Sequence, residues 1–149
     1  MFHMIEGAPK PVAPFSHATE IDGWVFLTGQ MPTDPKDHRA PLPAGIKAQT
    51  RKVMDNLVIV LGGLGLGLAD VVAARVFLTH FERDYAAMND VYRSYFPPAK
   101  LPARTCVGVT ALAVKALVEI DFIARRRSRS GKRVTARARK KTRRSVSGG

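Results

Sequence analysis

Charge divides this 149-residue chain into two parts of different kinds. Residues 125–149 hold 12 of its 24 Lys and Arg residues and none of its 12 Asp and Glu residues. This segment has no aromatic residue and only two valines, so it cannot bury enough apolar surface to fold alone. Residues 1–124 balance basic and acidic residues in equal number. We therefore expect one neutral folded domain over residues 1–124 and a disordered basic tail over residues 125–149.

Hydrophobic periodicity predicts the secondary structure of the neutral part. Asp22 and Gly23 form a dipeptide typical of tight hairpins, and alternating runs flank them. Two longer segments repeat apolar residues every three or four positions, which indicates amphipathic helices. The helices are expected at residues 46–64 and 81–96. The strands are expected at residues 17–20, 24–28, 71–79, 104–110 and 117–124, giving the order β-β-α-β-α-β-β.

This order predicts an α/β (α+β) domain, in which a mixed sheet carries both helices on one face. The other face of the sheet is left uncovered. Because the expected strands are apolar on both sides, a single chain would expose a large hydrophobic surface. The sequence therefore predicts an oligomer.

The scarcity of cysteine and histidine, and the contexts of the serines, argue against disulfide-linked, metal-binding and serine-hydrolase proteins. Cys106 is the single cysteine, so an intrachain disulfide is impossible. The four histidines show no spacing typical of metal ligands, and no serine has the Gly-x-Ser-x-Gly context of a hydrolase nucleophile. The first residues do not resemble a secretory signal, and the richest apolar stretch, residues 57–69, is too short to span a bilayer. We expect a cytoplasmic protein without a metal or a membrane partner.

Two charged residues stand where strands are predicted. Arg104 opens one predicted strand and Glu119 lies inside the next. Such residues are rarely buried unless they are paired or used. One interpretation is a structural ion pair or edge-strand charges; the other is a pocket in which a guanidinium binds a carboxylate while a carboxyl group handles a proton or water. Sequence spacing does not separate the two.

Four segments together resemble the successive signature blocks of the Rid/YjgF family. They are residues 27–32 (Leu-Thr-Gly-Gln-Met-Pro), 88–92 (Met-Asn-Asp-Val-Tyr), 102–107 (Pro-Ala-Arg-Thr-Cys-Val) and 118–124 (Val-Glu-Ile-Asp-Phe-Ile-Ala). The resemblance runs over residues 5–124. It implies a chorismate-mutase-like fold assembled as a homotrimer, a trimeric barrel, with three sites at the subunit interfaces.

The resemblance also implies roles for individual residues. Arg104 matches the arginine that binds the substrate carboxylate in family deaminases, and Glu119 matches the glutamate that positions and activates a water. Asn89 matches an asparagine at the site. Cys106 matches a cysteine that contributes mainly backbone contacts.

Two positions depart from the pattern of many family deaminases. Phe15 stands where they have a tyrosine, which removes a hydroxyl that could orient water or substrate. Thr28 stands where they have a serine, which keeps the hydroxyl and adds a methyl group. The reaction class stays compatible with both changes, while the rate and the substrate range are left open. Phe15 and Thr28 remain candidate substrate-binding residues.

The resulting hypothesis is an enamine/imine deaminase that hydrolyses 2-imino acids, such as those formed from 2-aminoacrylate, to 2-keto acids and ammonia. No cofactor is expected, because an imine carbon is already electrophilic. Two alternatives stay open. One is a non-catalytic sensor that binds a small carboxylic acid. The other is an RNA-directed function. The resemblance implies RNA cleavage or translation inhibition as possibilities, and residues 125–149 could bind nucleic acid nonspecifically through phosphate contacts.

Overall fold

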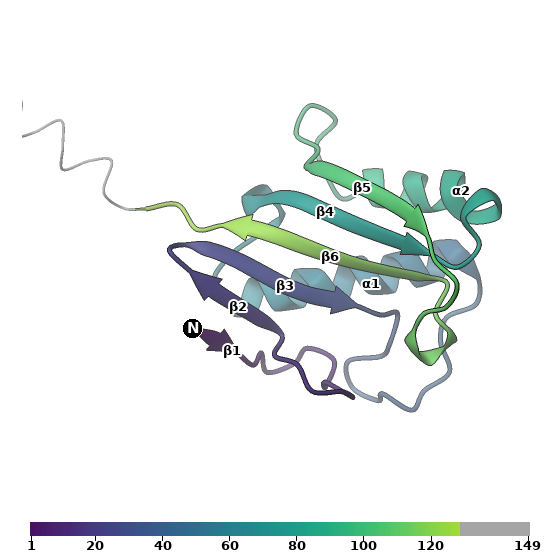
Figure 1. The fold of residues 1–149 in the computed structure, drawn as a ribbon, viewed down its shortest axis with the longest axis horizontal. Coiled ribbons are helices and arrows are strands. Elements are labelled where there is room, and N and C mark those ends of the chain that lie inside the picture. The colour runs from purple at the N-terminus through teal and green to yellow at the C-terminus, as the bar shows by residue number, and fades with distance from the viewer. Residues whose placement is uncertain (129–149) are drawn as a thin grey trace, which may run out of the picture.

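A computed structural model describes residues 1–128 of the chain as a six-stranded sheet with two helices (Figure 1). The strand order is β1-β2-β3-β6-β4-β5; β4 and β5 are parallel, and all other neighbours are antiparallel. The helices are α1 (Gly45–Gly63) and α2 (Phe81–Arg93). The strands are β1 (Phe2–His3), β2 (Ala18–Ile21), β3 (Trp24–Gln30), β4 (Val71–Leu78), β5 (Ala103–Gly108) and β6 (Val118–Arg125).

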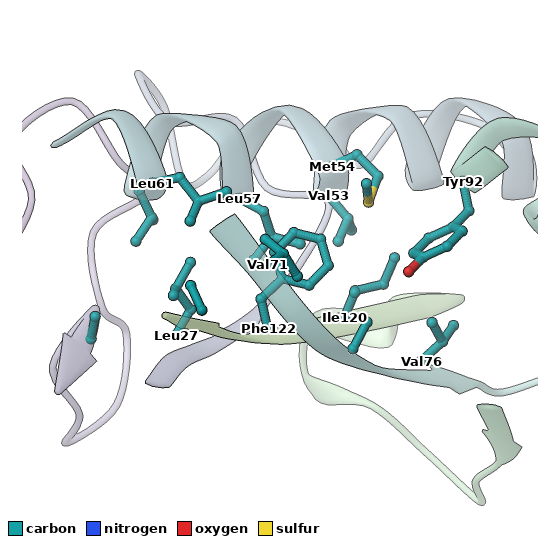
Figure 2. Close-up of a cluster of buried hydrophobic side chains, with 14 of the residues drawn as sticks. Leu27, Val53, Met54, Leu57, Leu61, Val71, Val76, Tyr92, Ile120 and Phe122 are labelled. Atoms are coloured by element: carbon teal, nitrogen blue, oxygen red, sulfur yellow. The ribbon is translucent and has the colours of Figure 1, made fainter. Parts of the chain in front are cut away.

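Both helices cover the same face of the sheet, as the sequence predicts (Figure 1). The apolar stripe of α1 packs mainly on β3 and β6, α2 packs on β4, and the side chains between these layers form the core (Figure 2). The largest fully buried side chains include Met54, Leu57, Leu61, Ile120 and Phe122. The opposite face of the sheet has no covering element among residues 1–128.

The hairpin between β2 and β3 confirms the interpretation of its turn. Asp22 and Gly23 both adopt positive φ, 50° and 78°. Two consecutive left-handed residues give the turn whose twist matches that of the flanking strands, which explains the preference for Asp-Gly there.

Most boundaries differ from the sequence prediction by about one to three residues, and one strand was not predicted. β1 was not expected, because two residues carry no periodic pattern; it forms by pairing Phe2 with Thr19 at the edge of the sheet. α2 ends at Arg93 rather than at residue 96, and turns lead from it to Pro97. β6 continues to Arg125, one residue beyond the expected domain boundary.

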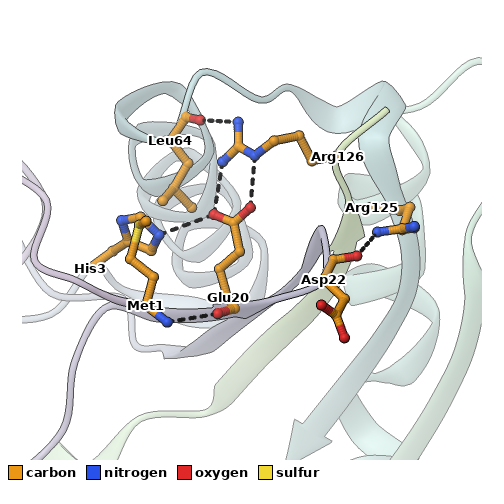
Figure 3. Close-up of polar contacts among 7 residues, drawn as sticks. All are labelled: Met1, His3, Glu20, Asp22, Leu64, Arg125 and Arg126. Carbon is orange, nitrogen blue, oxygen red and sulfur yellow. Dashed lines mark hydrogen bonds and ion pairs between the residues drawn. The ribbon is translucent and has the colours of Figure 1, made fainter. Parts of the chain in front are cut away.

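The first two residues of the expected tail are built into the domain (Figure 3). The guanidinium of Arg125 lies 5.1 Å from the ring centre of Trp24. Arg126 forms an ion pair with Glu20 at 2.8 Å and donates a hydrogen bond to the carbonyl of Leu64 beyond the end of α1. His3 contacts the same Glu20 carboxylate at 3.1 Å. The remainder of the expected disordered tail, residues 129–149, lies outside the described residues.

The sequence predicts no segment that spans a bilayer, and the helices of the structure allow this to be examined. Neither helix found within residues 1–128 combines the length and the apolarity that crossing a bilayer requires.

Asn56 connects α1 to the long loop that follows β3. Its side chain is fully buried, and its amide nitrogen donates to the carbonyls of Met31 and Thr33, both at 2.9 Å. We expect Asn56→Ala to lower the free energy of unfolding by about 1–3 kcal/mol, because two carbonyls lose their donor. Urea denaturation measures this, with the exposed Lys47→Ala on the same helix as the control. A loss no larger than that of the control would contradict the prediction.

Candidate active site

A hollow of about 210 Å³ lies between β5 and α2, at the edge of the sheet. Arg104 reaches it from β5, while Asn89, Tyr92 and Arg93 reach it from α2. Leu101 completes the lining. The parallel pairing of β5 with β4 fixes the position of Arg104, which stands opposite the buried Ala74 and therefore on the helix side of the sheet.

The guanidinium of Arg104 is held by aromatic rings and by no acidic group. It lies 4.9 Å from the ring centre of Tyr92 and 5.9 Å from that of Tyr85. It forms no hydrogen bond or ion pair with another residue of the described part of the chain. Cation–π contact orients a guanidinium while leaving its five N–H donors available. Arg104 is therefore positioned to bind an anion.

Two buried polar atoms beside Arg104 also lack a partner. Within residues 1–128, neither Oδ1 of Asn89 nor the hydroxyl of Tyr92 has a hydrogen bond. Burial raises the pKa of Tyr92 above its ordinary value, although the nearby Arg104 opposes this, so the hydroxyl stays protonated at neutral pH. Native proteins rarely leave such atoms unpaired unless a ligand or water completes them. Arg104 thus brings a cation to the hollow, and an amide oxygen and a hydroxyl lie enclosed without partners on the helix beside it.

Cys106 follows Arg104 by two residues on β5 and is half-buried against the core. Burial raises the pKa of its thiol, and Arg104 offsets this only in part. Because the thiolate is the nucleophilic form, this cysteine is poorly suited to covalent catalysis at neutral pH.

Glu119 lies on the uncovered face of the sheet. Its neighbours in β6, Val118 and Ile120, are fully buried against the helices, so strand alternation turns Glu119 the other way. The carboxylate rests on the backbone of Gly29, where an added Cβ would lie 2.7 Å from Oε1. Glycine therefore permits this close approach, and a larger residue would displace the Glu119 carboxylate. Burial, and next the Asp121 carboxylate, raise the pKa of Glu119 above its ordinary value.

Thr28 and Phe15 lie on the same uncovered face. They line one open hollow together with Phe26, and Phe15 also borders a second hollow that contains Gly29. The Thr28 hydroxyl donates to the carbonyl of Ser16 at 2.6 Å, which leaves its oxygen able to accept. The ring of Phe15 is 42% exposed, so it forms a pocket wall rather than part of the core.

The six sequence-predicted site residues thus form two groups on opposite sides of the sheet. Arg104, Asn89 and Cys106 gather beside α2, whereas Glu119, Thr28 and Phe15 lie on the uncovered face. The structural ion pair considered from the sequence is not formed within the described chain. The hollow that Arg104 lines does not include Glu119.

Tyr92 and Gly29 were not among the predicted site residues. Tyr92 follows Asn89 by three positions, which places both on one helix face. In the sequence it closes the 88–92 signature block, but no role was assigned to it. Gly29 stands inside the Thr-Gly-Gln segment, but only the packed structure shows that Glu119 lies against it.

Known proteins are similar to this chain over nearly the whole folded domain. The family model described as Endoribonuclease L-PSP matches residues 5–126. A RutC family protein of Pyrococcus horikoshii is 41% identical over 119 residues, which are 80% of this chain and 92% of that protein. The 3-aminoacrylate deaminase RutC of Acinetobacter baylyi is 38% identical over 119 residues, 80% and 92% of the two chains. The 2-iminobutanoate/2-iminopropanoate deaminase of Escherichia coli is 33% identical over 124 residues, 82% and 94%.

Solved structures of related proteins have the same fold as this chain. The YjgF gene product of E. coli superposes with a TM-score of 0.75 at 31% identity and covers 83% of this chain and 97% of its own. E. coli TdcF with bound serine gives a TM-score of 0.75 at 30% identity, covering 84% and 99%. The chain therefore belongs to the Rid/YjgF/RutC (endoribonuclease L-PSP) family and has the chorismate-mutase-like fold of the YjgF structure.

Proposed function

We propose that this protein is an imine deaminase that hydrolyses small 2-imino acids to 2-keto acids and ammonia. The observation that carries this proposal is the Arg104 guanidinium, oriented by Tyr92 and Tyr85 and unpaired with any described acidic residue. A carboxylate would fill that position, and a guanidinium binds one through two parallel hydrogen bonds. One relative is named a deaminase of 2-imino acids and another a deaminase of 3-aminoacrylate, and the TdcF structure holds serine; all of these compounds carry a carboxylate.

The reaction adds water across a C=N bond and then releases the nitrogen atom as ammonia. The substrate carboxylate binds Arg104, and Glu119 of a neighbouring chain takes a proton from water as its oxygen attacks the imine carbon. Glu119 passes this proton to the imine nitrogen, which gives a carbinolamine. The same carboxylate then moves the remaining hydroxyl proton to the nitrogen, so the C=O bond forms as the C–N bond breaks, and ammonia leaves with the 2-keto acid. The backbone near Cys106 and the Thr28 hydroxyl orient the nitrogen and the water. One water is consumed for each ammonia released, and no cofactor takes part.

A homotrimer is the proposed assembly. The uncovered face exposes large apolar side chains, among them Trp24 and Phe26 at 43% each. A ring of three chains would cover this face and bring the Arg104 group of one chain to the Glu119 group of the next. Three equal sites would result, each built from two groups that lie apart within one chain.

Imines made in situ test the proposal directly. An amino-acid oxidase would supply 2-imino acids, and their decay would be followed with and without the protein. We expect the protein to accelerate decay, and the exposed Arg51→Ala on α1 to do so equally. An unchanged decay rate would reject the proposal. Saturable binding of 2-keto acids without turnover would instead support the carboxylate sensor.

A second proposal, nucleic-acid binding, concerns the basic tail. Arg125 and Arg126 are engaged in the domain, which leaves ten Lys and Arg residues and no acidic residue in residues 127–149. Such a segment binds phosphates and releases counterions without reading bases.

Truncation of the tail measures this directly. We expect the full chain to bind single-stranded RNA with an affinity that falls steeply with salt, by a logarithmic slope of about 0.7 for each phosphate contact. A chain ending at Ser128 should lose this binding and keep imine hydrolysis. Equal RNA affinity of the two chains would contradict the proposal. RNA cleavage by the shorter chain would instead assign an RNA-directed activity to the domain.

A further inference from the structure

Arg75 and Asp121 form an ion pair with three hydrogen bonds on the uncovered face. They are register partners in β4 and β6. The Nε atom of Arg75 donates to both carboxylate oxygens, at 3.1 and 3.0 Å, and its Nη2 donates to Oδ2 at 2.6 Å. The side chain of Asp121 is only 12% exposed, against 66% for Arg75. The carboxylate is therefore enclosed, while the arginine reaches in from the open side.

Glu119 lies beside this pair without joining it. It precedes Asp121 by two residues on the same face of β6, and its register partner in β4 is Phe77, so it lies diagonally across from Arg75. A long side chain can reach a diagonal neighbour in a sheet. Glu119 nevertheless makes no ion pair with any residue between 1 and 128.

The charges that act on Glu119 come from two strands. Asp121 on its own strand and Arg75 on β4 are the charged groups that shift it, in opposite directions. β3 contributes the uncharged Gly29. Glu119 therefore faces a guanidinium that Asp121 neutralises as long as Arg75 stays paired with Asp121, and a free cation if that pair is broken.

We propose that Asp121 is a positioning residue for Glu119: by holding both Nε and Nη2 of Arg75, it keeps this guanidinium from pairing with the Glu119 carboxylate, which stays free to exchange a proton with water. This inference rests on the proposed imine hydrolysis. Without Asp121, Arg75 would turn to its diagonal neighbour and form a charge-assisted pair. Glu119 would then be held in the ionised form and withdrawn from the water that it activates.

Two single variants test this with opposite signs. Asp121→Asn removes a negative charge and frees Arg75, so Glu119 should titrate at lower pH than in the wild type. Arg75→Met leaves Asp121 unpaired, so Glu119 should titrate at higher pH. Carbon-13 NMR of labelled glutamate follows the carboxyl carbon of Glu119, assigned by its loss in Glu119→Gln. The acid limb of the pH–rate profile should move in the same directions.

The double variant separates this role from a structural one. Asp121→Asn should lower kcat about tenfold with little change in KM, because Arg104 still binds the substrate carboxylate. Adding Arg75→Met should restore both the titration and most of kcat. An Asp121→Asn protein that titrates like the wild type, or a double variant with no recovery, would overturn the inference. If Asp121→Asn fails to fold, Arg75→Met alone must still raise the pH at which Glu119 titrates.

The titration keeps this inference distinct from the proposed function. It needs no turnover, so a wild-type protein inactive toward imines would reject the deaminase proposal without altering the titration of Glu119. Unchanged titrations in an active enzyme would reject the role of Asp121 alone.

Discussion

Arg104→Ala is expected to lower kcat/KM for 2-imino acids by about 10²- to 10³-fold. Truncating one partner of an enclosed charge pair costs roughly 2–5 kcal/mol, and each factor of ten corresponds to about 1.4 kcal/mol. The guanidinium has no described acidic partner, so its removal leaves no buried carboxylate of the protein unpaired. The folded state should therefore be nearly unaffected, and the loss should fall on substrate binding.

Arg104→Lys divides the loss between charge and geometry. Lysine keeps the positive charge but lacks the planar fork that binds both carboxylate oxygens. Its activity should lie between the wild type and Arg104→Ala. Thermal unfolding would confirm that the variants stay folded, with Arg51→Ala as the matched arginine control. Near-normal kcat/KM in Arg104→Ala would contradict carboxylate binding at this position.

Much of the fold could be predicted because local chemistry decides it. The Asp22-Gly23 turn and the two amphipathic helices follow from backbone preferences and periodicity. β1 could not be predicted, since two residues gain a strand conformation only by pairing with β2. Arg126 was assigned to the tail on composition, whereas its ion pair with Glu20 depends on a strand more than one hundred residues away.

The site was predictable as a set of residues but not as an arrangement. Strand alternation shows which residues of one strand share a face. It does not show how that face relates to the face of another strand, because register and neighbours decide this. Arg104 and Glu119 therefore read as a pair in the sequence, although they lie on opposite sides of the sheet. The contact of Glu119 with Gly29 and the Arg75–Asp121 pair also arise only from strands brought together in the sheet.

Because Arg104 and Glu119 lie on opposite sides of the sheet, we expect activity to return when two inactive variants, one lacking each residue, are mixed. Glu119→Gln removes the proton acceptor and should lower kcat by about 10²- to 10⁴-fold. Arg104→Ala damages the other half of the site. If each site takes Arg104 from one chain and Glu119 from the next, a mixed trimer contains some sites with both residues intact. Random mixing of equal amounts in a closed ring leaves about one site in four complete.

Co-refolding the two variants tests this expectation. Each variant refolded alone should stay inactive, and the mixture should reach about a quarter of wild-type activity, since a symmetric ring samples the chains at random. Mixing Arg104→Ala with the double variant Arg104→Ala/Glu119→Gln is the matched control, because no chain in that mixture carries Arg104. Native mass spectrometry would verify that mixed trimers form. Mixed trimers without recovered activity would show that Arg104 and Glu119 do not share a site between chains, and the proposed mechanism would lose its proton acceptor.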